Sequence, residues 1–134
     1  MAGASIRHLP IGAGEDFVAN LKRAVKHAVP TPLALVLCFP SNPTAQVCDL
    51  DFYGEIVEFC RFHKIWILSD LAYSEIYFDD VPPPSILQVP NARDIAIEFT
   101  SMSKTYSMPG WRVGFAAGNR QGIIEHPEVR AVGG

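Results

Sequence analysis

The sequence predicts an α/β fold: an open, mostly parallel sheet with crossover helices and one antiparallel strand. Short unbroken apolar runs, each the length of a strand, alternate with segments whose apolar residues recur at helical spacing. That alternation is typical of β-α-β units, in which helices join parallel strands. The 134 residues are enough for one modest domain with its own core.

The N-terminal part is expected to hold a short strand and a helix. Residues 5–9 form the candidate strand, and a turn follows it. Apolar residues then recur at helical spacing over roughly residues 15–28, which predicts an amphipathic helix. Pro30 and Pro32 end that helix, because proline does not continue one.

Four further strands are expected at the apolar runs over residues 33–39, 65–68, 95–99 and 113–117. The first of these runs is unbroken and bounded by prolines. Such a run is typical of a strand that is buried on both faces of a sheet.

Two connections join the first three of these strands. Asp49 or Asp51 is expected to cap a helix in the first connection. The inner stripe of that helix is expected to consist of Tyr53, Ile56, Val57 and Cys60, with Phe52 and Phe59 widening it. The second connection is long and carries prolines at residues 82–84, so we expect a short helix near residues 71–77 followed by a stiff surface loop.

Polar side chains follow each predicted parallel strand at the point where the strand ends. Asn42 follows the first strand, Asp70 and Tyr73 follow the second, and Ser101 and Lys104 follow the third. Ligands of such sheets bind beyond the carboxyl ends of the strands. These side chains are therefore expected to gather at one edge of the sheet.

Arg112 is expected to reach the same edge by a different route. The link between the third and fourth strands is shorter than the dozen or so residues that a parallel crossover needs, so the fourth strand should run antiparallel. Its start then lies where the third strand ends, and Arg112 stands just before it.

Each residue of this group also has a purely structural interpretation. Asn42 suits a plain turn, and Asp70 and Ser101 suit helix N-caps. Tyr73 suits the rim of the core, and Arg112 suits a surface ion pair. The lysine between them would then be an ordinary loop residue. The convergence of all of them at one edge is what favours a functional site.

The residue types at this edge meet the needs of pyridoxal phosphate. A lysine shielded from water loses its proton more readily and becomes a nucleophilic amine, so Lys104 is the candidate for a Schiff base with the cofactor and for proton transfer. A buried carboxylate facing the pyridine nitrogen keeps that nitrogen protonated, and Asp70 is the candidate. Asn42 and Tyr73 offer hydrogen-bond donors to the ring oxygen.

The phosphate of the cofactor needs cationic and hydroxyl donors. Arg112 offers a planar fork of donors, and Ser101 offers a hydroxyl. The candidate catalytic residues are thus Lys104, Asp70 and Tyr73. The candidate cofactor-binding residues are these three together with Asn42, Ser101 and Arg112.

Four segments resemble, in this order, the motifs of the class I/II aminotransferases, which have the fold-type I architecture. They are Ser41-Asn42-Pro43-Thr44, Ser69-Asp70-Leu71-Ala72-Tyr73, Ser101-Met102-Ser103-Lys104 and Trp111-Arg112-Val113-Gly114. The resemblance spans residues 2–119, and residues 120–134 read as a divergent tail. It implies that residues 1–134 are part of the large, pyridoxal phosphate-binding domain of such an enzyme.

The resemblance also implies an activity: transfer of an amino group between an amino acid and a 2-oxo acid, by a homo-oligomer that is a dimer in the family. Full-length members are about three times longer, beyond the usual range of one domain. Parts that bind the phosphate, stack on the ring and hold the substrate carboxylate are then missing. We therefore expect weak or absent turnover by this chain alone.

Two other functions stay open. The second reading is an inactive truncated remnant that acts only as a self-associating or partner-dependent structural module, since open apolar edges invite pairing with another chain. A nucleotide-binding α/β domain is the third reading. It is disfavoured because neither a G-x-G-x-x-G motif nor a phosphate-binding P-loop is present.

Composition disfavours several partners. The formal net charge of −3 and the lack of a basic block argue against nucleic acid. No apolar run approaches the length of a membrane span, and the start of the chain does not resemble a signal peptide. Three scattered cysteines fit a reducing, cytoplasmic location. The four histidines lack metal-ligand spacing, so no metal is expected.

Overall fold

The computed structural model describes residues 5–12 and 14–125, with the side chains of residues 124 and 125 excepted. The chain divides into two compact units at the peptide between Pro32 and Leu33. Among the described residues, no helix combines the length and the hydrophobicity that a bilayer crossing requires.

The first unit contains helix α1 (Phe17–Lys26), which confirms the helix expected over residues 15–28. Asp16 is its N-cap, and Asp16 Oδ1 accepts a hydrogen bond of 2.9 Å from the Ala19 amide. The strand expected over residues 5–9 is wrong, because these residues form no regular structure. A strand requires a neighbour for its backbone hydrogen bonds, and the described part of this unit offers none.

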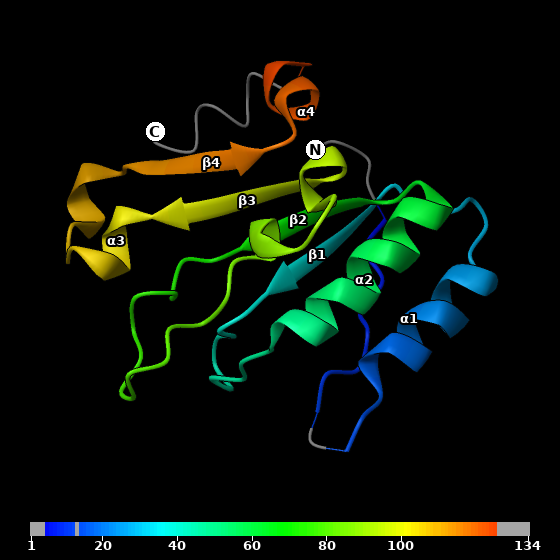
Figure 1. The fold of residues 1–134 in the computed structure, drawn as a ribbon, viewed down its shortest axis with the longest axis horizontal. Helices are drawn as coiled ribbons and strands as arrows, with labels where there is room; N and C mark the ends of the chain where they lie inside the picture. Colours follow the sequence, from blue (N-terminus) through cyan, green and yellow to red (C-terminus); the bar gives the residue numbers. More distant parts are fainter. Residues whose placement is uncertain (1–4, 13, 126–134) are drawn as a thin grey trace. The chain divides into compact units, whose positions relative to one another are not determined.

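The second unit is built on a four-stranded sheet. Its strands are β1 (Ala34–Cys38), β2 (Trp66–Asp70), β3 (Ala96–Ser101) and β4 (Gly114–Gly118), in that spatial order. The pairs β1–β2 and β2–β3 are parallel, whereas β4 runs antiparallel to β3, as the arrows in Figure 1 show. The predicted fold class, including its one antiparallel strand, is confirmed.

Helix α2 (Leu50–His63) joins β1 to β2 and covers one face of the sheet (Figure 1). Asp49 is the N-cap, since its Oδ1 accepts a hydrogen bond of 2.8 Å from the Phe52 amide. Lys64 ends the helix in the left-handed conformation. The predicted stripe is buried: Tyr53, Ile56, Val57 and Cys60.

Gly54 lies in the interior of α2, and a Cβ atom built on it would have no neighbour within 4 Å. Glycine in a helix interior costs free energy relative to alanine, because more backbone freedom is lost on folding. We expect Gly54→Ala to raise the free energy of unfolding by roughly 0.5–1 kcal/mol. Urea denaturation followed by circular dichroism would measure this change. A variant less stable than wild type would contradict the open surroundings of this position.

The two faces of the sheet differ in what covers them. Side chains alternate along each strand, so Leu35, Leu37 and Ile67 share the face under α2, where all three are buried. Val36 lies on the opposite face and keeps 69% of its surface exposed. The prediction that β1 is buried on both faces is therefore wrong for the described chain, because too little of this unit lies over the second face.

Helix α4 (Arg120–Glu125) is the element that reaches this second face. A Cβ atom built on Gly122 would lie 3.0 Å from Ile97 Cδ1 and 3.4 Å from Trp66 Cζ3. Helix α4 therefore covers Ile97 and Trp66, which lie near the amino ends of the parallel strands. Farther along this face, Val36 keeps most of its surface exposed.

The long connection between β2 and β3 contains turns rather than the short α-helix expected near residues 71–77. The Ser74 amide donates to the Leu71 carbonyl at 3.2 Å and the Ile76 amide donates to the Tyr73 carbonyl at 3.0 Å, and such bonds close turns of four residues. The expected surface loop is present, with Phe78 fully exposed. Two 3₁₀ turns follow, η1 (Ile86–Gln88) and η2 (Ala92–Asp94).

Candidate active site

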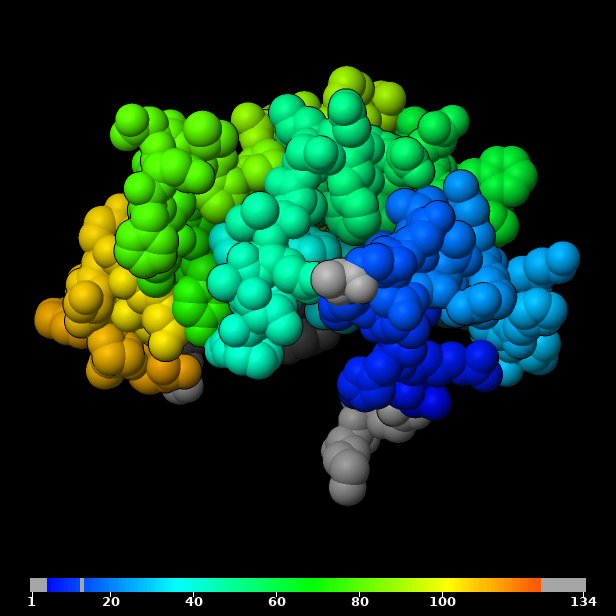
Figure 2. Space-filling view, turned by 90° about the horizontal axis from the view of Figure 1, so that it is seen from below, coloured from blue at the N-terminus to red at the C-terminus, as the bar shows by residue number. Residues whose placement is uncertain are grey.

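The carboxyl ends of β1, β2 and β3 open onto one edge of the sheet, and β4 begins at that edge (Figure 1). Figure 2 shows the segments that follow β1, β2 and β3, coloured from blue-green through green to yellow, on the same side of the molecule. Asp70 and Ser101 are the last residues of β2 and β3, and the other four residues singled out in the sequence lie on the segments that follow the strands or just before β4. The expected convergence at one edge is therefore present in the backbone.

Three of the six side chains meet directly. The Asn42 Nδ2 group donates a hydrogen bond of 3.1 Å to the Tyr73 hydroxyl. The Lys104 ammonium nitrogen lies 5.7 Å from the centroid of the Tyr73 ring, within the range of a cation–π interaction. Tyr73 thus joins the loop after β1 to the lysine segment after β3.

The loop that carries Asn42 is closed by Ser41. The Ser41 amide donates to the Gln46 carbonyl at 3.0 Å, and the Gln46 amide donates back to Ser41 Oγ at 3.0 Å. Pro40 and Pro43 restrict the backbone on either side of Asn42. These constraints hold the amide of Asn42 toward Tyr73 without any helix or strand in the loop.

Asp70 is the last residue of β2, in register with Cys38 on β1 and Phe99 on β3. Its Oδ1 accepts a hydrogen bond of 3.1 Å from the Ala72 amide and so also closes the turn that follows. The expectation of a buried carboxylate is wrong for the described chain, because Asp70 is exposed. Asp70 lies on the same face as Val36, which this unit leaves uncovered.

The thiol of Cys38 lies on β1 opposite Asp70 on β2, at the same edge of the sheet. Burial raises the pKa of the Cys38 thiol, and the negative charge of Asp70 adds to the rise. The Cys38 Sγ atom lies 3.7 Å from the Pro40 carbonyl oxygen. The charge of Asp70 on β2 thus influences the Cys38 thiol on the neighbouring strand β1.

Ser101 ends β3 and caps the short helix α3 (Met102–Thr105), in which Lys104 lies. The Ser101 Oγ atom accepts a hydrogen bond of 3.1 Å from the Ser103 amide. Lys104 is exposed, so the expected shielding of its amine from water is not provided by the described chain. The short helix ends after one turn, and it presents the lysine beyond the end of the sheet.

Arg112 precedes β4, as its predicted antiparallel course requires. It follows the 3₁₀ turn η3 (Pro109–Trp111) with a left-handed backbone, φ 52° and ψ 43°. Its Nη1 group donates to the Pro109 carbonyl at 3.2 Å. The Met102 amide donates to the Val113 carbonyl at 3.1 Å, which keeps the arginine segment beside the start of α3.

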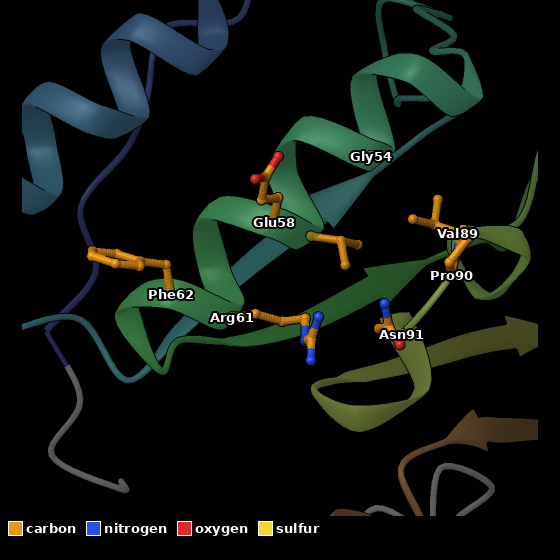
Figure 3. A pocket seen from close by; sticks show the side chains of 8 residues that line it. Gly54, Glu58, Arg61, Phe62, Val89, Pro90 and Asn91 are labelled. Carbon is orange, nitrogen blue, oxygen red and sulfur yellow. The ribbon is translucent and has the colours of Figure 1, made fainter.

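A pocket of about 550 Å³ lies on the outer side of α2, where the segment between η1 and η2 approaches it (Figure 3). Its lining is Gly54, Val57, Glu58, Arg61, Phe62, Val89, Pro90 and Asn91. None of the six candidate residues belongs to it. The candidate site is defined by the strand ends and not by this pocket.

Glu98, which was not among the residues predicted from the sequence, is a carboxylate in the middle of β3 and is only 9% exposed. Its Oε1 accepts a hydrogen bond of 2.7 Å from the Ser85 hydroxyl, and its Oε2 accepts one of 3.0 Å from the Ile86 amide. The buried hydroxyls of Tyr53 and Ser69 have no well-directed hydrogen bond within the described residues. The signal in the sequence that could have identified Glu98 is the presence of a charged residue inside an otherwise apolar strand.

Burial raises the pKa of the Glu98 carboxyl, while the hydrogen-bond donors of Ser85 and Ile86 oppose the rise. A carboxyl whose pKa is higher in the folded state binds more protons there, so stability falls as pH rises from the unfolded pKa through the folded pKa. We expect wild type to lose stability relative to Glu98→Gln as pH rises from about 4 toward neutrality. Urea midpoints of both proteins across this range measure the difference, and a constant or rising difference would contradict the prediction.

The protein family described as "Aminotransferase class I and II" matches residues 5–131 of this chain. The chain therefore belongs to the class I and II aminotransferases. The match extends past Asn119 into the segment that the sequence analysis treated as a divergent tail, of which residues 126–134 lie outside the described structure.

Two curated relatives illustrate the similarity. The chain is 58% identical over 131 residues to the "Putative aminotransferase AatC" of Rhizobium meliloti (strain 1021), which covers 98% of this chain and 32% of the relative. It is 45% identical over 120 residues to the "Glutamate-pyruvate aminotransferase AlaC" of Escherichia coli (strain K12), covering 90% of this chain and 29% of the relative. The chain thus spans about a third of the length of these relatives.

Solved structures agree with the fold. The aromatic aminotransferase from Pyrococcus horikoshii OT3 superimposes with a TM-score of 0.76 at 32% identity, over 87% of this chain and 31% of that structure. The four strands and their order therefore belong to the aminotransferase fold-type I architecture.

Proposed function

We propose that this chain carries the lysine-bearing part of a pyridoxal phosphate-dependent aminotransferase site, which transfers an amino group between an amino acid and a 2-oxo acid. The observation that carries the proposal is the contact of Tyr73 with both Asn42 and Lys104 at the carboxyl edge of the sheet. Membership of the aminotransferase family supports the reaction class. The names of the relatives cover several substrates, so the amino donor stays open.

The donor groups at this edge fit the cofactor. An amine, a carboxylate, a guanidinium, an amide and two hydroxyls complement its aldehyde, pyridine nitrogen, phosphate and ring oxygen. Because the Tyr73 oxygen already accepts a hydrogen bond from Asn42, the hydroxyl proton of Tyr73 is left to donate to a ligand. Lys104 would hold the cofactor covalently, Asp70 would face the pyridine nitrogen, and Arg112 with Ser101 would bind the phosphate.

When bound, pyridoxal phosphate supplies an electron sink for the substrate carbon. The task of the Lys104 amine is then to move a proton at that carbon. The task of Asp70 is to present its carboxylate to the pyridine nitrogen of the bound cofactor. The amide of Asn42 orients the Tyr73 hydroxyl, so that its donor points in one direction.

A second candidate function is favoured by the uncovered sheet face. Val36 and the open edges of β1 and β4 leave apolar and backbone groups that another chain could cover. On this alternative the chain is an inactive structural module that self-associates or depends on a partner. We infer homo-oligomerisation and, from the three free cysteines, a reducing cytoplasmic location for either function.

The experiment adds pyridoxal phosphate to the folded chain, records the absorbance spectrum, and then treats the sample with borohydride to fix any lysine-bound cofactor. Peptide mapping identifies the labelled lysine. Labelling concentrated on the peptide that contains Lys104 supports the proposed site. Equal low labelling of the exposed lysines in a folded sample would overturn it and favour the structural module. A coupled assay of amino-group transfer is expected to give weak or no turnover by the isolated chain, since Asp70 and Lys104 are exposed in it and the orientation of reacting groups contributes several powers of ten in rate.

A further inference from the structure

The long connection between β2 and β3 is fastened to the sheet at both of its ends. At its start, the Leu71 amide donates a hydrogen bond of 2.8 Å to the Phe99 carbonyl. At its end, Ser85 and Ile86 donate to the carboxylate of Glu98. Glu98 and Phe99 are consecutive residues of β3, so the segment between these anchors is a compact loop whose ends lie close together. We call this segment, residues 71–86, the tyrosine loop, because it carries Tyr73.

From this geometry we propose that Glu98 is a positioning residue: its carboxylate closes the tyrosine loop and thereby keeps Tyr73 beside Asn42 and Lys104. The proposal rests on the function proposed above for its relevance to catalysis. The closure of the loop itself rests on contacts between residues of this chain alone.

The end of the loop is ordered around the carboxylate. Ser85 Oγ donates to Glu98 and also accepts a hydrogen bond of 3.1 Å from the Leu87 amide. The Ser85 amide donates to Gln88 Oε1 at 2.8 Å, which completes a capping box on η1. Ile86 is fully buried, so its amide has no water to replace the carboxylate. Removal of the carboxylate therefore leaves a buried donor without its partner.

Besides these anchors, the tyrosine loop is held near its start by the Ala72 amide, which donates to Asp70, and by the Tyr73 hydroxyl, which accepts from Asn42. Within it, the described backbone bonds are those of short turns, with the Ser74 amide bound to Leu71 and the Ile76 amide bound to Tyr73. The residues around Phe78 are exposed and contribute no core packing. Loss of one anchor converts a closed loop into a longer segment with greater conformational freedom. Tyr73, which lies near the other anchor, would then leave Asn42 part of the time.

The test compares Glu98→Ala with wild type by native-state hydrogen exchange and by nuclear Overhauser effects, without cofactor. Exchange of the Ser74 and Ile76 amides is expected to accelerate about tenfold, as for the loss of a charge-assisted hydrogen bond. Exchange of the Ile67 amide in the sheet should change little. The contact between the Asn42 side-chain amide and the Tyr73 ring should weaken in parallel.

Two further variants make the result specific. Glu98→Gln retains a carbonyl acceptor for Ile86 and an amide that can donate to Ser85, so it is expected to restore wild-type exchange. Glu55→Ala removes an exposed carboxylate of α2 and should leave both readouts unchanged. A uniform acceleration of all amides in Glu98→Ala, or none, would overturn the proposal. So would an unaltered contact between Asn42 and Tyr73.

A separate arm measures the uptake of pyridoxal phosphate. Where wild type binds the cofactor, Glu98→Ala should weaken binding about tenfold, which corresponds to about 1.4 kcal/mol. Unchanged binding would refute the link between loop closure and the site. Failure of wild type itself to bind would refute the proposed function, while hydrogen exchange would still decide whether Glu98 closes the loop.

Discussion

Replacement of Lys104 by alanine is expected to abolish the covalent attachment of pyridoxal phosphate to this chain. Lys104 is the lysine whose ammonium lies at the Tyr73 ring, beside the amide of Asn42. Its segment follows β3 directly and ends after a single helical turn. The substitution removes the amine and leaves the surrounding hydrogen bonds of Ser101 and Asn42 in place. Borohydride-fixed label should fall to the background of an exposed lysine.

Lys22→Ala is the matched control, because Lys22 is exposed on α1 and alanine favours the helix. Its labelling and its long-wavelength absorbance should match wild type. Circular dichroism of both variants should agree with wild type, since neither lysine is part of the core. Labelling that persists in Lys104→Ala, or that disappears in Lys22→Ala, would contradict the assignment.

Replacement of Gly118 by alanine is expected to lower the free energy of unfolding by about 3 kcal/mol or more. Gly118 ends β4 with φ 142°, in the region that favours glycine. A Cβ atom there would lie 2.2 Å from the Ala96 carbonyl oxygen and 2.9 Å from the Ile97 Cα atom. Both contacts are with backbone, so the strand pair itself would have to separate.

Gly110→Ala provides the control for this prediction. Gly110 lies in the exposed turn η3, and a Cβ atom there would meet nothing within 4 Å. Its urea midpoint should stay close to that of wild type. A Gly118→Ala protein with an unchanged midpoint would show that β4 does not lie as close to β3 as the register requires.

The secondary structure of the second unit follows from local patterns. Residues 65–68 are a short apolar run, and β2 extends this run by the two polar residues at its end. Asp49 was one of two candidate caps, and it is the N-cap of α2. Such features depend on the spacing of apolar residues over a short stretch of sequence and on capping side chains that bond to amides a few residues away. They are therefore visible before the chain is folded.

The position of the candidate site followed from a rule of topology. Parallel strands end at one edge, so Asn42 and Tyr73 could be expected to approach each other although they are distant in sequence. The hydrogen bond between them agrees with that expectation. The chemical roles of the six residues stay proposals, which the labelling experiment tests.

Solvent exposure could not be predicted in the same way. Asp70 was expected to be buried and Lys104 to be shielded, and both are exposed in this chain. Burial depends on which elements lie over a face, and the pattern of a strand does not show whether those elements are present. The same reason explains the exposed Val36 on a strand that reads as fully apolar.

By itself, the sequence determined the four strands of the sheet, the helices α1 and α2, the antiparallel course of β4 and the edge at which the polar residues gather, because each of these follows from local periodicity and the length of connections. Only the tertiary structure decided that the segment after Asp70 is a turn, that one sheet face is open, and that Glu98 is paired with Ser85 and Ile86. The turn and the pairing of Glu98 depend on the path of a long loop, which brings distant groups together through the sum of many weak contacts, whereas the open face depends on which elements lie over it.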